Sequence, residues 1–262
     1  MKSIAITSVP GFDEWREASR ECLSQHIAPE DIIWKSVHTL QEDLFGDMGE
    51  NAEKKKVQRN HTIPKPVLTL IKYALCHTDD SKFSLCYRVL WRVVYENKKL
   101  IQLKTDGDVI QLYAMAKAVK RDAYKMSAFL RFREVKLAGQ EHFVAWYEPE
   151  HFSLEINLSF FQTRFKNMRW SILTPYRAAH WDTETLVLED NPDSSAAPDE
   201  DRIEKYWLTY YANIFNPARI KTNAMLNQMP KKYWKNMPET SLIGDMIKQS
   251  DARVRKMISN ED

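Results

Sequence analysis

MAKAVKRDAYKMSAFLRFREV, residues 115–135, carries the strongest fold signal in this chain, because one side-chain periodicity gives way to another within it. In its first half, apolar residues recur at intervals of three and four, as they do on the buried face of a helix. From residue 128 onward, apolar and charged residues alternate, which is typical of a strand. The pattern therefore predicts a long helix over residues 109–127 and a strand over 128–135.

The predicted helix has two chemically different faces. Its apolar residues fall on one side and are expected to be buried: Leu112, Met115, Ala116, Val119 and Met126. Cations fall on or beside the other side, where Lys120, Arg121 and Lys125 lie on consecutive turns and can bind adjacent phosphates. A solvated helix surface is the alternative explanation of the same pattern.

Two arginines of the predicted strand are expected to point the same way. Arg131 and Arg133 are two residues apart, about 6.6 Å along a strand, which is near the spacing of successive phosphates in a nucleic acid. An ion-pair ladder with Glu148 or Glu150 on the neighbouring strand is the alternative.

Downstream of this region, the pattern predicts a small sheet. After a turn, residues 142–148 form the returning strand of a β-hairpin. A short helix over 160–168 precedes two further strands, 170–174 and 185–188, which flank PYRAAHWD, residues 175–182. We expect PYRAAHWD to form the polar tip of the second hairpin.

Upstream, short strands over residues 3–8 and 32–34 flank a helix over 12–25. Two densely apolar helices follow over 67–77 and 82–95. Helices therefore outnumber strands in the predicted order of elements.

The expected fold class is α+β: a helix-rich single globular body with a small antiparallel sheet built from two β-hairpins. One domain is expected over residues 1–262, with a subdivision into 1–40, a mobile connection over 41–60, and a main body over 61–262. A further helix is predicted after the acidic segment near residue 200, and a polar helix at the C-terminal end.

The composition indicates a protein with a sizeable core. The chain has 262 residues, 44% of them hydrophobic, and a formal net charge of +2, so its total charge predicts little. Cys22, Cys76 and Cys86 have neither disulfide nor metal-ligand spacing. Because the chain shows no signal-peptide core and no apolar run of about 18 residues, we expect a cytoplasmic protein without membrane contact.

Charges are unevenly distributed along the chain. Basic residues dominate 115–136 and 216–236, whereas acidic residues dominate 182–204. A nearly neutral protein with separate basic and acidic faces suits local recognition of an anion.

Aromatic and cationic residues occur together at two further places. In PYRAAHWD, Tyr176 or Trp181 can stack on a base while Arg177 binds phosphate. The second place is a contact for single-stranded nucleic acid formed by Lys231, Lys232 and Trp234. For the second, the alternative is that Trp234 anchors the C-terminal region and the lysines are merely exposed.

Candidates for catalysis are few. His180 beside Asp182 suggests an acid–base pair, because a carboxylate can hold an imidazole in one tautomer; a turn-stabilising histidine is the alternative. A second acidic and histidine group flanks a strand end and suggests acid–base or metal chemistry, although without a defined ligand spacing: His142, Glu148, Glu150 and His151.

Motifs for cofactors are absent from the sequence. It contains no Walker loop, no GxGxxG, no CxxC pair and no HExxH, and it has only 6 glycines. The sequence therefore predicts no cofactor and no metal site.

Eight phrases, in order over nearly the whole chain, carry a family resemblance. They are FDEWREASRECL, IAPEDIIW, FSLCYRVLWRV, MAKAVKRDAYKMSAFLRFRE, FVAWYEPEHF, FFQTRFKNMRWSILTPYRAAHWD, YYANIFNPARIKTNAM and MPKKYWKNMPE. In these phrases the chain resembles a bacterial family of unknown function that is associated with DNA repair or DNA metabolism.

The resemblance implies a functional context and no catalytic residues. Members of that family accompany a radical-SAM protein of the DNA modification or repair type, and in some relatives the domain is fused to a uracil-DNA glycosylase-like domain. This sequence contains neither that glycosylase domain nor a cysteine cluster for an iron–sulfur centre. The resemblance therefore places radical or glycosidic chemistry in a partner protein.

Three functional hypotheses follow, in order of preference. The first is a DNA-repair accessory protein that binds single-stranded or damaged DNA and works with a radical-SAM partner. The second is an enzyme that acts on a nucleotide or DNA base, glycosylase- or nuclease-like, with weak catalytic candidates His180, Asp182, Glu148 and His151. The third is a protein-binding subunit of the same pathway, which docks its partner through the acidic residues 182–204.

Overall fold

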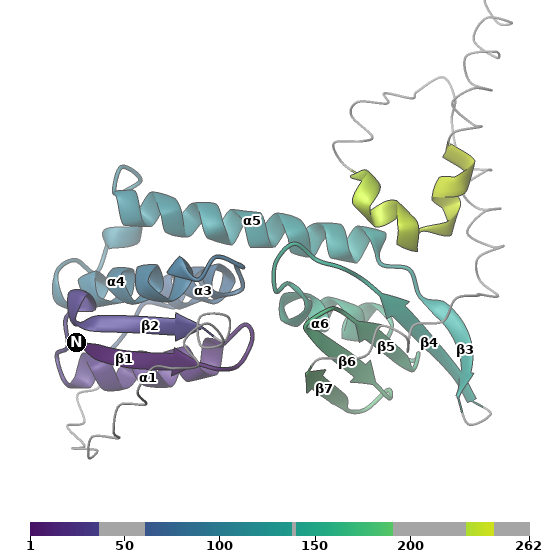
Figure 1. Cartoon of the computed structure of the whole chain (residues 1–262), viewed down its shortest axis with the longest axis horizontal. Coiled ribbons are helices and arrows are strands. Elements are labelled where there is room, and N and C mark those ends of the chain that lie inside the picture. The colour runs from purple at the N-terminus through teal and green to yellow at the C-terminus, as the bar shows by residue number, and fades with distance from the viewer. Residues whose placement is uncertain (37–60, 138–139, 191–228, 244–262) are drawn as a thin grey trace, which may run out of the picture. The chain divides into compact units, whose positions relative to one another are not determined.

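The structure, a computed structural model, describes residues 1–36, 61–137, 140–190 and 229–243. Its helices and strands are labelled in Figure 1. The chain divides into two compact units. Unit 1 consists of Met1–Asp122 and Glu150–Ser153, and unit 2 consists of Ala123–Pro149 and the residues from Leu154 onward.

Unit 1 begins with a βαβ arrangement. Strands β1 (Lys2–Ile6) and β2 (Ile32–Ser36) pair in parallel, and α1 (Phe12–Ser24) forms the crossover between them. The predicted order of strand, helix and strand is confirmed. α1 buries one apolar side, which includes Trp15 and Cys22, as its helical periodicity predicts.

The turn into α1 requires a glycine. Gly11 has φ of +81°, a conformation that side chains rarely adopt, and a Cβ there would clash with Cγ2 of Ile6. The preceding backbone is fixed by Glu14, whose carboxylate accepts the N–H groups of Thr7 and Ser8 at 2.6 and 3.1 Å. The loop between β1 and α1 is therefore well defined.

Helices α3 (Lys65–Leu75), α4 (Ser81–Tyr95) and the first part of α5 (Gly107–Phe129) supply the rest of the core of unit 1. In Figure 1 the two strands lie between α1 on one side and α3 and α4 on the other. The apolar residues predicted for the buried side of α5 are all buried: Leu112, Met115, Ala116, Val119 and Met126.

A segment from later in the chain completes unit 1. Buried Asp122 of α5 fixes this segment, because its carboxylate accepts the N–H groups of Glu150 and His151 at 3.1 and 3.0 Å. It also accepts the hydroxyl of Ser153 at 2.9 Å. Three hydrogen bonds thus satisfy a carboxylate that is only 1% exposed.

Unit 2 is built on a five-stranded sheet with the order β3–β4–β5–β6–β7. The strands are β3 (Arg133–Leu137), β4 (Gln140–Trp146), β5 (Trp170–Leu173), β6 (Arg177–Trp181) and β7 (Leu186–Asp190). The first expected hairpin is present as the antiparallel pair β3–β4, but the second is not, because β5 and β7 flank β6 and do not pair with each other. Strands β4 and β5 pair in parallel. This pairing requires a crossover, which contains α6 (Leu154–Arg164).

Three local predictions differ from the structure. PYRAAHWD is not a hairpin tip, because residues 177–181 form β6, which lies between β5 and β7. The strand predicted from residue 128 begins at Arg133, because α5 continues to Phe129. Helix α6 also begins six residues before the predicted start at 160.

The sheet of unit 2 has two different faces. One face packs against Phe161 of α6 and carries Trp170, Ile172 and Trp181. The opposite face carries the side chains that alternate with these, among them Ser171, His142 and His180, beside a small buried apolar cluster.

The predicted helix-rich α+β class is confirmed. A single domain over residues 1–262 stays a prediction. The predicted connection over residues 41–60, the helix after the acidic segment, and the final polar helix lie outside the described residues, as does the acidic segment beyond Asp190. None of the helices that the structure describes combines the length and hydrophobicity of a membrane span.

Candidate functional site

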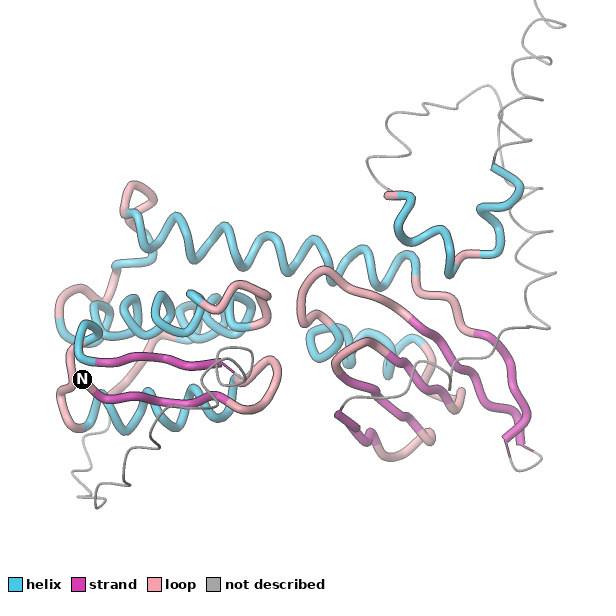
Figure 2. Tube along the Cα trace, viewed as in Figure 1, coloured by secondary structure: helices cyan, strands magenta, loops and turns pink. Residues whose placement is uncertain are grey.

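Helix α5, a single continuous helix in Figure 2, carries an exposed stripe of cations and aromatic rings. Tyr113 and Tyr124 are 46% and 72% exposed, and Lys117, Lys120 and Arg121 are exposed between them. Tyr113, Lys117, Arg121 and Tyr124 follow one another at intervals of three or four residues, with Lys120 next to Arg121, so they share one side of the helix. These five residues are called the α5 stripe below.

The cations of the stripe are available to a ligand. Lys120 Nζ lies 4.5 Å from the ring centroid of Tyr73, a cation–π contact that leaves the charge in place. Among the residues that the structure describes, neither Lys117 nor Arg121 forms an ion pair. The predicted placement of Lys120 and Arg121 on an exposed helix surface is therefore confirmed.

Lys125 does not belong to this surface, although the sequence places it near Lys120 and Arg121. It is 8% exposed, and its Nζ lies 5.7 Å from the ring centroid of Tyr233 in unit 2. The lysine stem is thus packed against an aromatic ring. Lys125 faces the protein interior, so its predicted exposed position is wrong.

Arg131 and Arg133 do not lie side by side on one strand. Arg131 precedes β3 and donates hydrogen bonds to the carbonyl oxygens of Ala128 and Leu130 at 2.8 and 3.2 Å, closing the end of α5. Arg133 begins β3 opposite Val144. The predicted regular spacing of two phosphate contacts is therefore absent.

In β6, Arg177 is already neutralised by the protein. Its Nη1 lies 2.9 Å from Oε1 of Glu155, and its Nη2 lies 2.7 Å from Oδ1 of Asp190. Burial raises the pKa of the Glu155 carboxyl, although the nearby guanidinium opposes that shift. Arg177 is thus a structural cation, 14% exposed, and its side chain does not point from a hairpin tip.

Tyr176, just before β6, and Trp181, at its end, also form hydrogen bonds within the protein. The Tyr176 hydroxyl donates to Oε2 of Glu155 at 3.0 Å and accepts the N–H of Leu154 at 2.9 Å. Trp181 is 9% exposed, and its Nε1 donates to the carbonyl oxygen of Lys166 at 3.1 Å. Trp181 is therefore buried and not presented to a base, whereas the ring of half-buried Tyr176 stays a predicted stacking surface.

The C-terminal aromatic and lysine group is divided between core and surface. It lies in the short helical turn η5 (Lys231–Asn236). Lys231 and Lys232 are exposed, whereas Trp234 is half-buried and its Nε1 donates to the carbonyl oxygen of Met229 at 3.1 Å. The alternative prediction, in which Trp234 is an anchor, describes this geometry better.

A hydrogen-bonded chain crosses three strands of unit 2. Nε2 of His142 lies 2.8 Å from Oγ of Ser171, which lies 2.7 Å from Nδ1 of His180. Nε2 of His180 lies 3.2 Å from Oε2 of Glu189. We call these four residues the His–Ser–His–Glu chain.

One arrangement of protons satisfies all three contacts of this chain. Glu189 accepts from Nε2 of His180, so Nδ1 of that ring accepts the Ser171 hydroxyl, and Ser171 in turn accepts from Nε2 of His142. Burial, with contributions from His180 and Arg169, lowers the pKa of His142. A continuous relay of this kind can hold or move a proton.

The carboxylate partner of His180 differs from the sequence prediction. Asp182 accepts the N–H groups of Glu184 and Thr185 at 2.8 and 2.6 Å, and these hydrogen bonds lower its pKa. Glu189 of β7 contacts His180 instead. The sequence reasoning missed Ser171 and Glu189, because their proximity to His180 depends on the strand register.

The other catalytic candidates are not members of the His–Ser–His–Glu chain. Glu148 accepts from Nζ of Lys235 at 2.6 Å and from Nε1 of Trp146 at 2.9 Å, and these two contacts lower its pKa. His151 belongs to unit 1, where its ring centroid lies 4.2 Å from that of His77. No group of three His, Cys, Asp or Glu side chains suited to a metal occurs among the described residues.

The predicted binding residues are divided between the two units. Lys120 and Arg121 belong to unit 1, and the others belong to unit 2, where Arg177 has its own carboxylates. The stripe gains two rings that the sequence reasoning missed, Tyr113 and Tyr124. Helical periodicity was the available signal for them, since they lie four and three residues from the cations.

Comparison with known proteins identifies a family model. A model described as a domain of unknown function, DUF4130, matches residues 80–239. This span contains α4, α5 and the whole sheet of unit 2. No curated protein and no solved structure matches the chain.

Proposed function

We propose that this chain, which belongs to the DUF4130 family, is an accessory protein of DNA repair or DNA metabolism that binds nucleic acid and works with a radical-SAM partner enzyme. The observation that carries the proposal is the α5 stripe, in which exposed cations without carboxylate partners among the described residues lie between two exposed tyrosines.

The spacing of the stripe fits a single strand of nucleic acid. Lys117 and Arg121 are four residues apart, about 6 Å along a helix, which is near the distance between successive phosphates. Tyr113 and Tyr124 stand beyond them, and an aromatic ring stacks on any unpaired base. A partly unpaired or damaged DNA offers both groups at once, whereas an intact duplex offers only its phosphates.

The family resemblance stated above supports the repair context. It supplies the radical-SAM partner and, in some relatives, a uracil-DNA glycosylase-like domain. The geometry of the stripe supports the binding role. An accessory protein that presents DNA to such a partner unites the two lines of support.

Fluorescence anisotropy of labelled oligonucleotides tests the binding role. The double variant Lys117→Glu/Arg121→Glu is expected to bind a single-stranded oligonucleotide at least about tenfold more weakly than the unchanged protein at low salt. The matched control is Lys98→Glu/Lys99→Glu, which makes the same charge change at exposed lysines elsewhere in unit 1. Equal losses in the two variants would show a general charge effect and contradict a site on α5.

A co-purification experiment tests the partnership. The radical-SAM protein encoded with a family member is expected to be retained by this chain, and retention should survive nuclease treatment if the contact is between proteins. Loss of retention after nuclease treatment would show that DNA bridges the two proteins. Absence of retention in both conditions would contradict the partnership and leave the binding role intact.

A second candidate function is supported by the His–Ser–His–Glu chain. In an enzyme acting on a nucleotide or DNA base, His180 would take or give a proton while Glu189 stabilises the charged ring. Release of free base or strand scission should then fall by about a hundredfold or more in His180→Gln. Asp182→Asn, which changes a carboxylate that does not contact His180, is the matched control.

A further inference from the structure

Lys82, at the start of α4, is a buried amine. It is 2% exposed, and its Nζ donates to the carbonyl oxygen of His77 at 2.7 Å. The rings of Phe83 and Phe152 flank it, with centroids 4.9 and 4.6 Å from Nζ. Phe152 is fixed in place because its N–H donates to the carbonyl oxygen of Cys76 at 2.9 Å.

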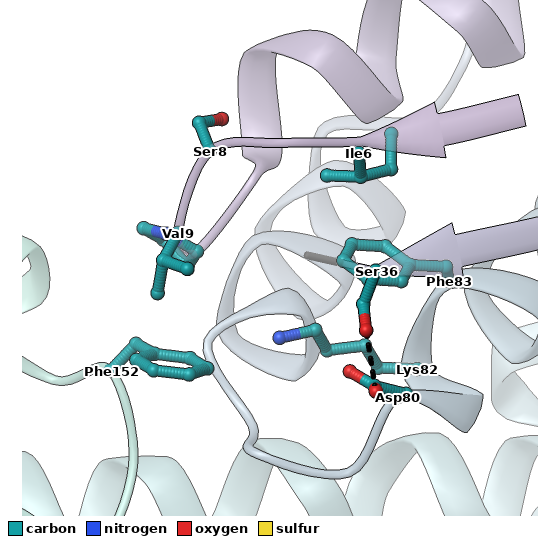
Figure 3. Close-up of a pocket in the computed structure, with 9 residues that line it drawn as sticks. Ile6, Ser8, Val9, Ser36, Asp80, Lys82, Phe83 and Phe152 are labelled. Atoms are coloured by element: carbon teal, nitrogen blue, oxygen red, sulfur yellow. Dashed lines mark hydrogen bonds between the residues drawn. The ribbon is translucent and has the colours of Figure 1, made fainter. Parts of the chain in front are cut away.

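The amine lines a small pocket in unit 1, shown in Figure 3. The lining residues are Ile6, Ser8, Val9, Pro10, Ser36, Asp80, Lys82, Phe83 and Phe152. Ile6 and Ser36 end the parallel strands β1 and β2, so the pocket lies at their carboxyl edge. This edge is where open α/β arrangements bind small ligands.

The pKa of the Lys82 amine differs from that of an ordinary lysine. Burial is the dominant influence and lowers the pKa of Lys82 to about 8, against the opposing effect of nearby acidic groups. Those groups are Asp80, Cys76, Cys86 and Asp79. At pH 7 roughly one Lys82 in ten is then neutral, against roughly one in 2,500 for an ordinary lysine.

We propose that Lys82 is the nucleophile of a binding site for a small aldehyde or ketone, with which it forms an imine. Nζ attacks the carbonyl carbon, and the carbonyl oxygen leaves as water with the two hydrogens of the amine, so that a C=N bond replaces the C=O bond. Neutral amines in apolar pockets are the usual form of such nucleophiles.

The geometry suits this step in three ways. A neutral amine that donates one N–H to the His77 carbonyl keeps its lone pair for a carbon electrophile. The two phenylalanine rings limit water around the nitrogen. The Asp80 carboxylate accepts the Ser36 hydroxyl at 2.6 Å. The small size of the pocket restricts the carbonyl compound to a short chain.

Reductive alkylation of the full chain tests the proposal. Acetaldehyde is added at limiting concentration with cyanoborohydride, which reduces an imine to a stable ethylamine, and the modified lysines are located by peptide mass spectrometry. At pH 7 the labelling of Lys82 is expected to exceed that of exposed Lys99 by about tenfold or more, because burial lowers the pKa of Lys82. The labelling of Lys82 should level off above about pH 8.

A Lys82→Met variant provides the control. It should no longer show the preferred ethylation at position 82, while its far-ultraviolet circular dichroism and its binding of oligonucleotides should equal those of the unchanged protein. If the variant does not fold, the pH profile of the unchanged protein still decides. Lys82 that stays unmodified at pH 9, while Lys99 is modified, would show a sealed structural lysine and overturn the proposal.

Discussion

Arg121 in unit 1 and Arg177 in unit 2 look alike in sequence, since each is a cation beside aromatic residues. Arg121 lies on an exposed helix surface and has no ion pair among the described residues. Arg177 lies between two carboxylates, at 2.9 and 2.7 Å, and is 14% exposed. The first guanidinium is free to bind a phosphate, whereas the second binds the protein itself.

The difference teaches that residue type alone does not identify an anion site. A phosphate must displace the carboxylates of Arg177 before it can bind there, and a buried Glu155 would lose its partner. At Arg121 a phosphate displaces only water and counterions. Exposure and pairing therefore separate binding cations from structural ones.

The largest expected effect is on stability at Arg177. Arg177→Met should lower the free energy of unfolding by about 3 kcal/mol, because Glu155 is left buried without its cation. Urea titration followed by tryptophan fluorescence measures this loss. Arg121→Met, the matched change on α5, should stay within about 0.5 kcal/mol. Equal losses would erase the distinction between the two arginines.

Next in size is the contribution of an exposed ring. Tyr124→Ala should weaken binding of a single-stranded oligonucleotide about tenfold, the effect of one lost base stack. Anisotropy against a duplex of the same sequence should change far less. Tyr176→Phe, which removes a hydroxyl engaged with Glu155, should leave both affinities unchanged. A duplex affinity that falls as much as the single-strand affinity would count against stacking.

Salt dependence provides a smaller but specific test. Arg121→Ala should reduce the slope of log affinity against log salt by about 0.7 to 0.9, the value for one phosphate contact. Asp190→Asn, which loosens Arg177 instead, should leave the slope as it is. An unchanged slope in Arg121→Ala would remove that residue from the proposed interface.

The smallest effect concerns pH. The pKa of His142 is lowered in the folded state, so the unfolded chain binds more protons just below pH 6.5 and stability falls as pH drops through that region. His142→Gln should flatten this part of the dependence of the melting temperature on pH. If the melting temperatures of His142→Gln and of the unchanged protein change in parallel from pH 7.5 to 5.5, the lowered pKa of His142 is contradicted.

Periodicity predicted the elements whose determinants are local. The buried side of α5 was correctly assigned because its five apolar residues repeat at helical spacing, and the same reasoning located α1 and the strands beside it. In these elements each residue's environment follows from its neighbours along the chain.

Pairing between distant segments could not be predicted in the same way. β6 holds Arg177 and His180 in the middle of a sheet, which their polarity argued against, and their partners Glu155 and Glu189 lie on other elements. The parallel pairing of β4 with β5 likewise depends on a crossover through α6. Ser171 gave no local signal, because its two histidine partners lie on the neighbouring strands β4 and β6.

The hydrogen bonds of Asp122 limit where the chain can be truncated. Their donors, in residues 150–153, follow the first two strands of unit 2 in the sequence. A recombinant fragment ending at residue 122 would therefore leave the Asp122 carboxylate without these three donors and would lack Phe152, which packs beside Lys82. Expressing the N-terminal portion alone should yield an aggregation-prone polypeptide, whereas grafting residues 150–153 behind a short linker should restore its solubility.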